Sequence, residues 1–113
     1  MSCEEDQPMG EKYEFFPDYV KAQLPPLYSQ ERQKDPIVRV KFFCPWNQWT
    51  WFATEGEQRE GDYLFFGYVI GHEREWGYFL LSELQSVTGP WGLKIERDIH
   101  FSPRPKSQVP EIK

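Results

Sequence analysis

The sequence of 113 residues is poor in the side chains on which disulfide scaffolds and zinc sites depend. It contains two cysteines, Cys3 and Cys44, and two histidines, His72 and His100. Two cysteines can form at most one disulfide, and Cys3 and Cys44 are too far apart in the sequence to form the closely spaced ligand pair of a zinc finger or ribbon. A disulfide scaffold is therefore excluded, and the simplest expectation is a reduced cytoplasmic protein.

Long apolar runs and a basic N-terminus are also missing. The longest stretch without a charged residue, from Phe42 to Thr54, contains Pro45 and is shorter than the roughly 20 apolar residues that cross a bilayer as a helix. The first residues carry acids, whereas a secretory signal peptide begins with basic residues. We therefore expect neither a membrane span nor a signal peptide.

Basic residues do not outnumber acidic residues in the sequence either. The formal net charge is −5, and residues 55–83 hold seven acids against two arginines. Because binding to phosphates depends on cationic side chains, a general affinity for nucleic acid is disfavoured. Single-strand binding through Arg39, Lys41 and the basic C-terminal residues stays open, since such proteins combine aromatic rings with a basic groove.

Aromatic residues, in contrast, are abundant. Nine Phe, six Tyr and five Trp make up 18% of the chain, whereas disordered chains have few such residues. We therefore expect one folded domain over residues 15–101, with most rings in its core. Residues 1–14 are predicted to be a flexible acidic tail. Residues 102–113 contain three prolines and are predicted to be poorly ordered or to lie over the surface.

The pattern of apolar residues predicts an α+β fold. Alternation with a period of two indicates strands, and the turns between them are too short for parallel crossovers. We expect a four-stranded antiparallel meander over residues 37–44, 48–54, 62–70 and 76–81, with a charged turn at 55–61. Short helices are expected after Pro17 and after Ser82, and residues 94–101 are expected to be extended.

One run offers a possible catalytic set. Glu96, Asp98 and His100 alternate, so an extended segment would place them on one face. Two carboxylates and an imidazole could hold a divalent metal for the hydrolysis of phosphodiesters. The alternative is a solvated strand face whose acids pair with Lys94 and Arg97. No other metal site, cofactor site or catalytic arrangement is supported.

The acidic residues of two expected loops suggest a different function. They flank a strand that carries Trp76 and Tyr78, which could anchor a partner protein while the charges attract its basic surface. The alternative is a set of solvated loops that only confers solubility. The predicted binding surface comprises Glu55, Glu57, Glu60, Asp62, Glu73, Glu75, Trp76 and Tyr78.

The order of motifs resembles the small domain-of-unknown-function family number 2958, which is found on bacterial plasmids, integrative elements and phages. The resemblance covers about residues 16–101. The motifs that carry it are Leu24-Pro25-Pro26-Leu27-Tyr28, Val40-Lys41-Phe42-Phe43, Trp49-Thr50-Trp51, Phe65-Phe66-Gly67, Gly77-Tyr78-Phe79 and Ile95-Glu96-Arg97-Asp98. The family has no established reaction, so the resemblance implies no catalytic residues.

What the resemblance implies is a setting among the accessory proteins of mobile DNA, where inhibitors of host defence are common. We therefore predict a non-catalytic protein that binds a host or element-encoded protein complex, and one form of this function is inhibition of a CRISPR or restriction complex. Some family members are labelled as single-stranded DNA endonucleases. The alternatives are accordingly a metal-dependent endonuclease and a single-strand binding protein.

Overall fold

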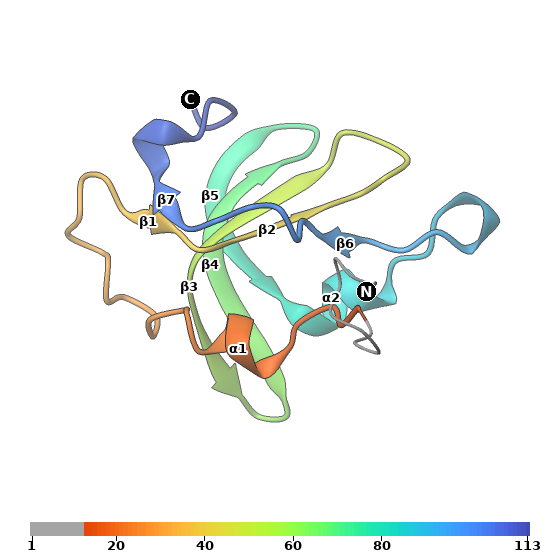
Figure 1. The fold of residues 1–113 in the computed structure, drawn as a ribbon, viewed down its shortest axis with the longest axis horizontal. Coiled ribbons are helices and arrows are strands. Elements are labelled where there is room, and N and C mark those ends of the chain that lie inside the picture. The colour runs from red at the N-terminus through yellow and green to blue at the C-terminus, as the bar shows by residue number, and fades with distance from the viewer. Residues whose placement is uncertain (1–12) are drawn as a thin grey trace, which may run out of the picture.

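The computed structural model describes residues 13–113, so Cys3 and most of the predicted acidic tail lie outside it. The fold is α+β, as predicted, with a five-stranded antiparallel sheet and two short helices (Figure 1). The strands of this sheet, in spatial order, are β5 (Arg74–Leu80), β4 (Asp62–Ile70), β3 (Thr50–Arg59), β2 (Val40–Phe43) and β6 (Glu96–Arg97). The helices are α1 (Asp18–Lys21) and α2 (Leu81–Ser86).

The predicted meander is formed by β2 to β5, and β6 extends it at the β2 edge. Phe42 pairs with Arg97 and Phe43 with Glu96. A separate two-stranded sheet joins β1 (Ile37–Val38) to β7 (Arg104–Pro105), beyond the end of β2 that is farther from β6 (Figure 1). β6 and β7 are two residues long, which is too short to produce a recognisable alternation. β1 and β2 divide the segment that was predicted as one strand over residues 37–44.

The charged turn expected over residues 55–61 is wrong, because β3 continues to Arg59. The actual turn consists of Glu60 and Gly61, whose φ angles of 46° and 80° suit a tight two-residue hairpin connection. The register shifts between Ala53 and Glu55, which indicates a β-bulge at Thr54. The bulge interrupts the alternation, and the acids that follow it make the second half of the strand look like a loop.

One face of the sheet, here called the helix face, packs against the two helices. Its core contains Phe42, Phe65 and Phe79 from the strands, together with Val20 of α1 and Leu84 of α2. The rings of Phe42 and Phe65 meet edge to face with centroids 5.5 Å apart. This is the geometry that aromatic pairs prefer, so the central strands and both helices share one core.

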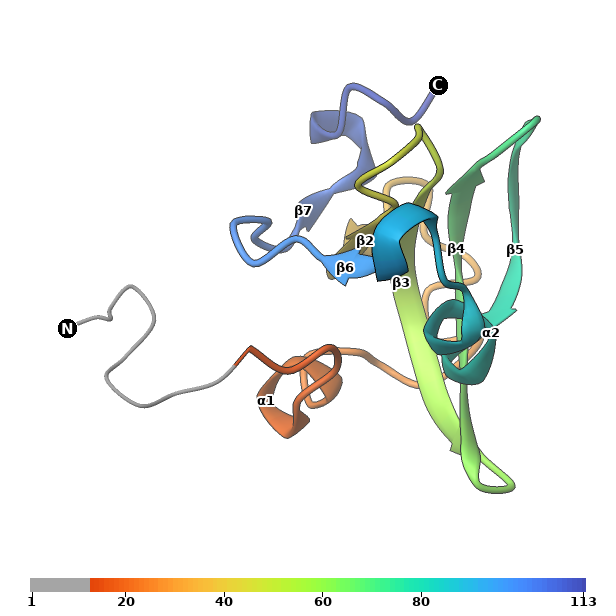
Figure 2. The ribbon, with the colours of Figure 1, turned by 90° about the vertical axis from the view of Figure 1, so that its right-hand side faces the viewer.

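The opposite face, here called the tail face, packs against the C-terminal segment. Phe52 and Tyr68 of the sheet form a second buried cluster with Val38 and Val109. Further contacts fix this segment: Ser107 donates two hydrogen bonds to Asp35, and the Arg74 side chain donates one to the Glu111 carbonyl. The C-terminus therefore lies near the turn between β4 and β5 (Figure 2).

Residues 102–113 were expected to be poorly ordered or to lie over the surface. They lie over the tail face and also contribute Val109 to its core. Pro105 pairs with Ile37 in β7, a position that a proline tolerates in a short strand at a sheet edge. The folded domain thus continues beyond the boundary at residue 101.

Truncation of Val109 tests this role of the C-terminal segment. Val109 is 3% exposed, so Val109→Ala should lower the free energy of unfolding by about 2 kcal/mol through lost burial and a residual cavity. The matched substitution Val87→Ala, at a residue that is 39% exposed, should change it by less than about 0.5 kcal/mol. Urea denaturation of both variants measures the difference, and equal effects would contradict the assigned second core.

Candidate protein-binding site

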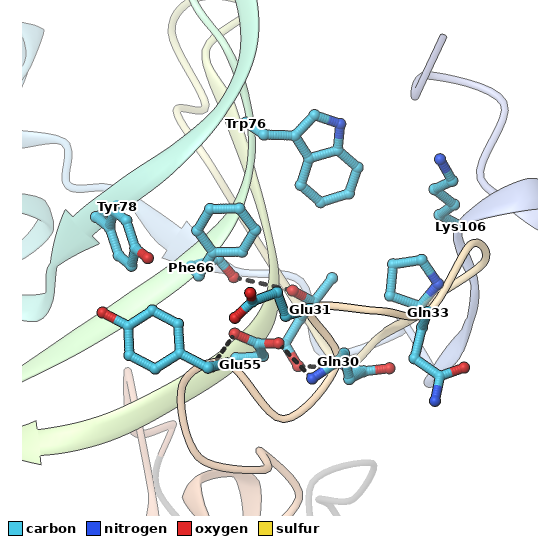
Figure 3. Close-up of a pocket in the computed structure, with 11 residues that line it drawn as sticks. Gln30, Glu31, Gln33, Glu55, Phe66, Trp76, Tyr78 and Lys106 are labelled. Carbon is cyan, nitrogen blue, oxygen red and sulfur yellow. Dashed lines mark hydrogen bonds between the residues drawn. The ribbon is translucent and has the colours of Figure 1, made fainter.

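A concave pocket of about 410 Å³ opens on the tail face, between the sheet and the loop that precedes β1. One wall comes from strands β3, β4 and β5, and the other comes from residues 28–36 and Lys106 (Figure 3). We call it the aromatic pocket. It is lined by Tyr28, Gln30, Glu31, Gln33, Pro36, Thr54, Glu55, Phe66, Trp76, Tyr78 and Lys106.

The strand wall is aromatic because the register of β4 and β5 aligns their rings. Phe66 pairs with Tyr78 across the two strands, and Tyr68 pairs with Trp76. The Phe66 ring lies 5.0 Å from that of Tyr78 and is stacked at 5.9 Å from that of Trp76, with 19° between the two planes. Cross-strand packing of this kind fixes the rings, so the wall is preformed.

The loop wall is held by the carboxylate of Glu55. The N–H of Tyr28 donates to Oε1 at 2.8 Å, and the N–H of Gln30 donates to Oε2 at 2.7 Å.

The next two residues of β3 also bind the segment before this loop. Gly56 N–H donates to the carbonyl of Pro25, and the Glu57 carboxylate accepts a bond from Leu27 N–H. These bonds cover the edge of β3 beyond the bulge, where the pairing with β2 has ended.

Two residues of the loop depend on this attachment. Tyr28 has a φ of 71°, a left-handed conformation that is uncommon for a residue other than glycine. The Gln30 side chain donates to the Thr54 carbonyl at 2.9 Å and accepts from Ile37 N–H at 2.8 Å. The loop is therefore tied to β3 at one end and to β1 at the other, which holds Tyr28 at the mouth of the pocket.

The charges in the pocket are unequal. Glu31 and Glu55 contribute carboxylates, whereas Lys106 contributes the one cation among the lining residues. The Lys106 ammonium lies 5.7 Å from the centre of the Trp76 ring, within the range of a cation–π interaction. Hydrogen bonding with the hydroxyl of Tyr28 raises the pKa of Tyr78, so the Tyr78 phenol stays protonated at neutral pH.

The predicted acidic surface is divided by the fold. Glu73 and Glu75 lie near the turn between β4 and β5, whereas Glu60 and Asp62 lie at the turn between β3 and β4, at the other end of the sheet (Figures 1 and 2). Of the predicted residues, the aromatic pocket brings together Glu55, Trp76 and Tyr78.

Three of the predicted acids have structural partners. Glu55 is 4% exposed and holds the loop. Glu57 accepts a bond from Arg59 at 2.8 Å, and this bond lowers the pKa of Glu57. Asp62 accepts bonds from the Ser82 hydroxyl and N–H at the start of α2, and these bonds lower the pKa of Asp62. Glu60, Glu73 and Glu75 are exposed.

The alternative metal set is not assembled into a site. Within residues 13–113, no group of three or more His, Cys, Asp or Glu side chains could hold a metal ion. Asp98 faces the ammonium of Lys41 at 3.7 Å and accepts a bond from the N–H of His100, whereas Glu96 is exposed on β6. The described part of the chain therefore gives the endonuclease alternative no set of metal ligands.

Arg97, for which pairing with a neighbouring acid was one alternative, contacts the N-terminal segment instead. Its guanidinium donates to the carbonyls of Phe15 at 3.1 Å and Glu14 at 2.9 Å. Its backbone N–H donates to the hydroxyl of Tyr13. Arg97 is buried, so this arginine stabilises the fold and is not available to a ligand.

Sequence reasoning missed Tyr28, Glu31 and Phe66 as residues of the pocket. Phe66 was assigned to a strand, and its alternation with Phe65 could have placed it on the face that carries Trp76 and Tyr78. Tyr28 and Glu31 carried no such signal, because only the hydrogen bonds of Glu55 bring their loop against the sheet.

Comparison with known families identifies the chain. The family described as "Protein of unknown function (DUF2958)" matches residues 20–109. The protein belongs to this family. The matched region contains α2, every strand and all residues that line the aromatic pocket. No curated protein and no solved structure matched the sequence. Among the described helices, none is long and apolar enough to cross a membrane.

The attachment by Glu55 can be tested by removing its charge. In Glu55→Gln, one oxygen is replaced by an NH₂ group that cannot accept a bond, so one buried N–H loses its partner. We expect the free energy of unfolding to fall by about 2 kcal/mol or more. Glu60→Gln, on the exposed turn of the same hairpin, should change it by less than about 0.5 kcal/mol. Similar denaturation midpoints for the two variants would show that Glu55 does not hold the loop.

Proposed function

We propose that this protein binds another protein and has no catalytic activity of its own. The observation that carries the proposal is the aromatic pocket, which combines three strand residues whose rings are fixed, Phe66, Trp76 and Tyr78, with the loop held by Glu55. Rigid aromatic side chains are the residue type that most often dominates binding energy at protein interfaces.

The position of the pocket supports a protein partner. Trp76 and Tyr78 belong to β5, which is the terminal strand of the sheet. Tyr78 is 51% exposed, so its ring is available for contact. A terminal strand offers backbone groups to an extended segment of a partner, while the neighbouring pocket receives its side chains.

We propose the following setting for this activity. The protein is an accessory protein of a bacterial mobile element or phage, it acts in the cytoplasm, and its partner is a host or element-encoded complex. Inhibition of a host defence complex, of the CRISPR or restriction type, is one form of this function. The mobile-element setting is what the resemblance of the motifs implies, since the description of the matched family names no function. The formal net charge of −5 disfavours nucleic acid as the main partner.

Capture from a host lysate with matched tyrosine variants tests the proposal. Tyr78 lies in the pocket and Tyr19 lies on α1; they are 51% and 65% exposed, respectively. We expect Tyr78→Ala to reduce the amount of the main captured protein by roughly tenfold or more, as expected for an interface anchor. Tyr19→Ala should leave it unchanged.

Two results would contradict this function. One is equal capture by the Tyr78→Ala, Tyr19→Ala and unmodified proteins. The other is cleavage of single-stranded DNA in Mg²⁺ or Mn²⁺ that Asp98→Ala abolishes, because it would establish the endonuclease alternative. Circular dichroism of each variant confirms that the fold is intact.

A further inference from the structure

We infer that the aromatic pocket is a receptor for an arginine side chain of the partner. This inference rests on the proposed protein-binding function and specifies the chemistry that the pocket recognises. Three features of the pocket support it: more carboxylates than cations in its lining, ring faces of suitable orientation, and a cation of the chain itself that already lies on one of these rings.

The first feature is an excess of negative charge. The lining residues include two carboxylates, those of Glu31 and Glu55, and one ammonium, that of Lys106. Neither carboxylate forms an ion pair within residues 13–113, whereas Glu57 pairs with Arg59 and Glu111 pairs with Lys41. A pocket with this balance attracts a cation and disfavours an acidic side chain.

The two carboxylates would act differently on the arginine side chain of the partner. Both oxygens of Glu55 accept backbone hydrogen bonds, so this charge is fixed in the wall and acts mainly through its field. Glu31 is exposed, and no hydrogen bond involves its side chain within the described part of the chain. Its carboxylate is therefore free to accept paired N–H bonds from a guanidinium.

The second and third features favour a planar cation. The rings of Phe66 and Trp76 are nearly parallel, with 19° between their planes, and Tyr78 lies beside Phe66. The ammonium of Lys106 already lies over Trp76, which shows that this ring accepts a cation. A guanidinium stacks on aromatic faces and is less strongly hydrated than an ammonium, so arginine suits this wall better than lysine.

A pair of peptides that differ only in charge tests the inference. The probes are acetyl-Gly-Gly-Arg-Gly-Gly-amide and the same peptide with citrulline, the neutral isostere of arginine. Binding is followed by ¹⁵N NMR titration of the full chain at low salt. We expect the arginine peptide to shift the indole N–H of Trp76 and to bind roughly tenfold more tightly than the citrulline peptide.

Matched carboxylate variants identify the site. Glu31→Gln should weaken binding of the arginine peptide several-fold, because it removes the free carboxylate at the mouth of the pocket. Glu60→Gln, on the distant turn, should leave the affinity unchanged. Equal binding of the two peptides, shifts that do not involve Trp76, absence of binding, or insensitivity to Glu31→Gln would each overturn the inference.

The outcome is separable from that of the proposed function. If Tyr78→Ala abolishes capture of a partner but the arginine peptide does not bind, the pocket binds a protein, but the inference that it receives an arginine side chain is wrong. If the peptide binds as expected but capture does not depend on Tyr78, the inferred chemistry holds and the proposed use of the pocket in partner binding fails.

Discussion

The carboxylate of Glu55 is the interaction on which the candidate site depends. The bulge at Thr54 turns this side chain toward the tail face and leaves the following edge of β3 without a paired strand. Glu55 then accepts bonds from Tyr28 N–H and Gln30 N–H, so one side chain takes the place of a strand. The left-handed conformation of Tyr28 and the loop wall of the pocket both follow from this attachment.

The alternation of apolar residues predicted the α+β class and the meander, and buried residues do alternate with less buried ones along β2 and most of β4. It failed where local pattern carries little information. The bulge at Thr54 ended the alternation before Arg59, and β6 and β7 are only two residues long. The folding of residues 102–113 onto the sheet depends on Val109 and on long-range bonds to Asp35, which no local signal predicts.

The candidate site was predicted in part, for a related reason. Trp76 and Tyr78 lie in the pocket because their positions in β5 place them on the same face. The acids were interpreted together as one surface, yet the two turns lie at opposite ends of β4. In addition, the carboxylates of Glu55, Glu57 and Asp62 accept hydrogen bonds that stabilise the fold. A carboxylate that accepts backbone N–H groups looks the same in sequence as one that faces solvent, and only the three-dimensional contacts distinguish them.

The most direct test of this account is the amide hydrogen exchange of the pocket loop, measured by NMR. If Glu55 holds the loop, the amides of Tyr28 and Gln30 should be protected in the unmodified protein, although neither belongs to a helix or strand. In Glu55→Gln their protection should fall while that of the β4 amides largely persists. Rapid exchange of both loop amides in the unmodified protein would contradict the account, because the pocket would then have no fixed second wall.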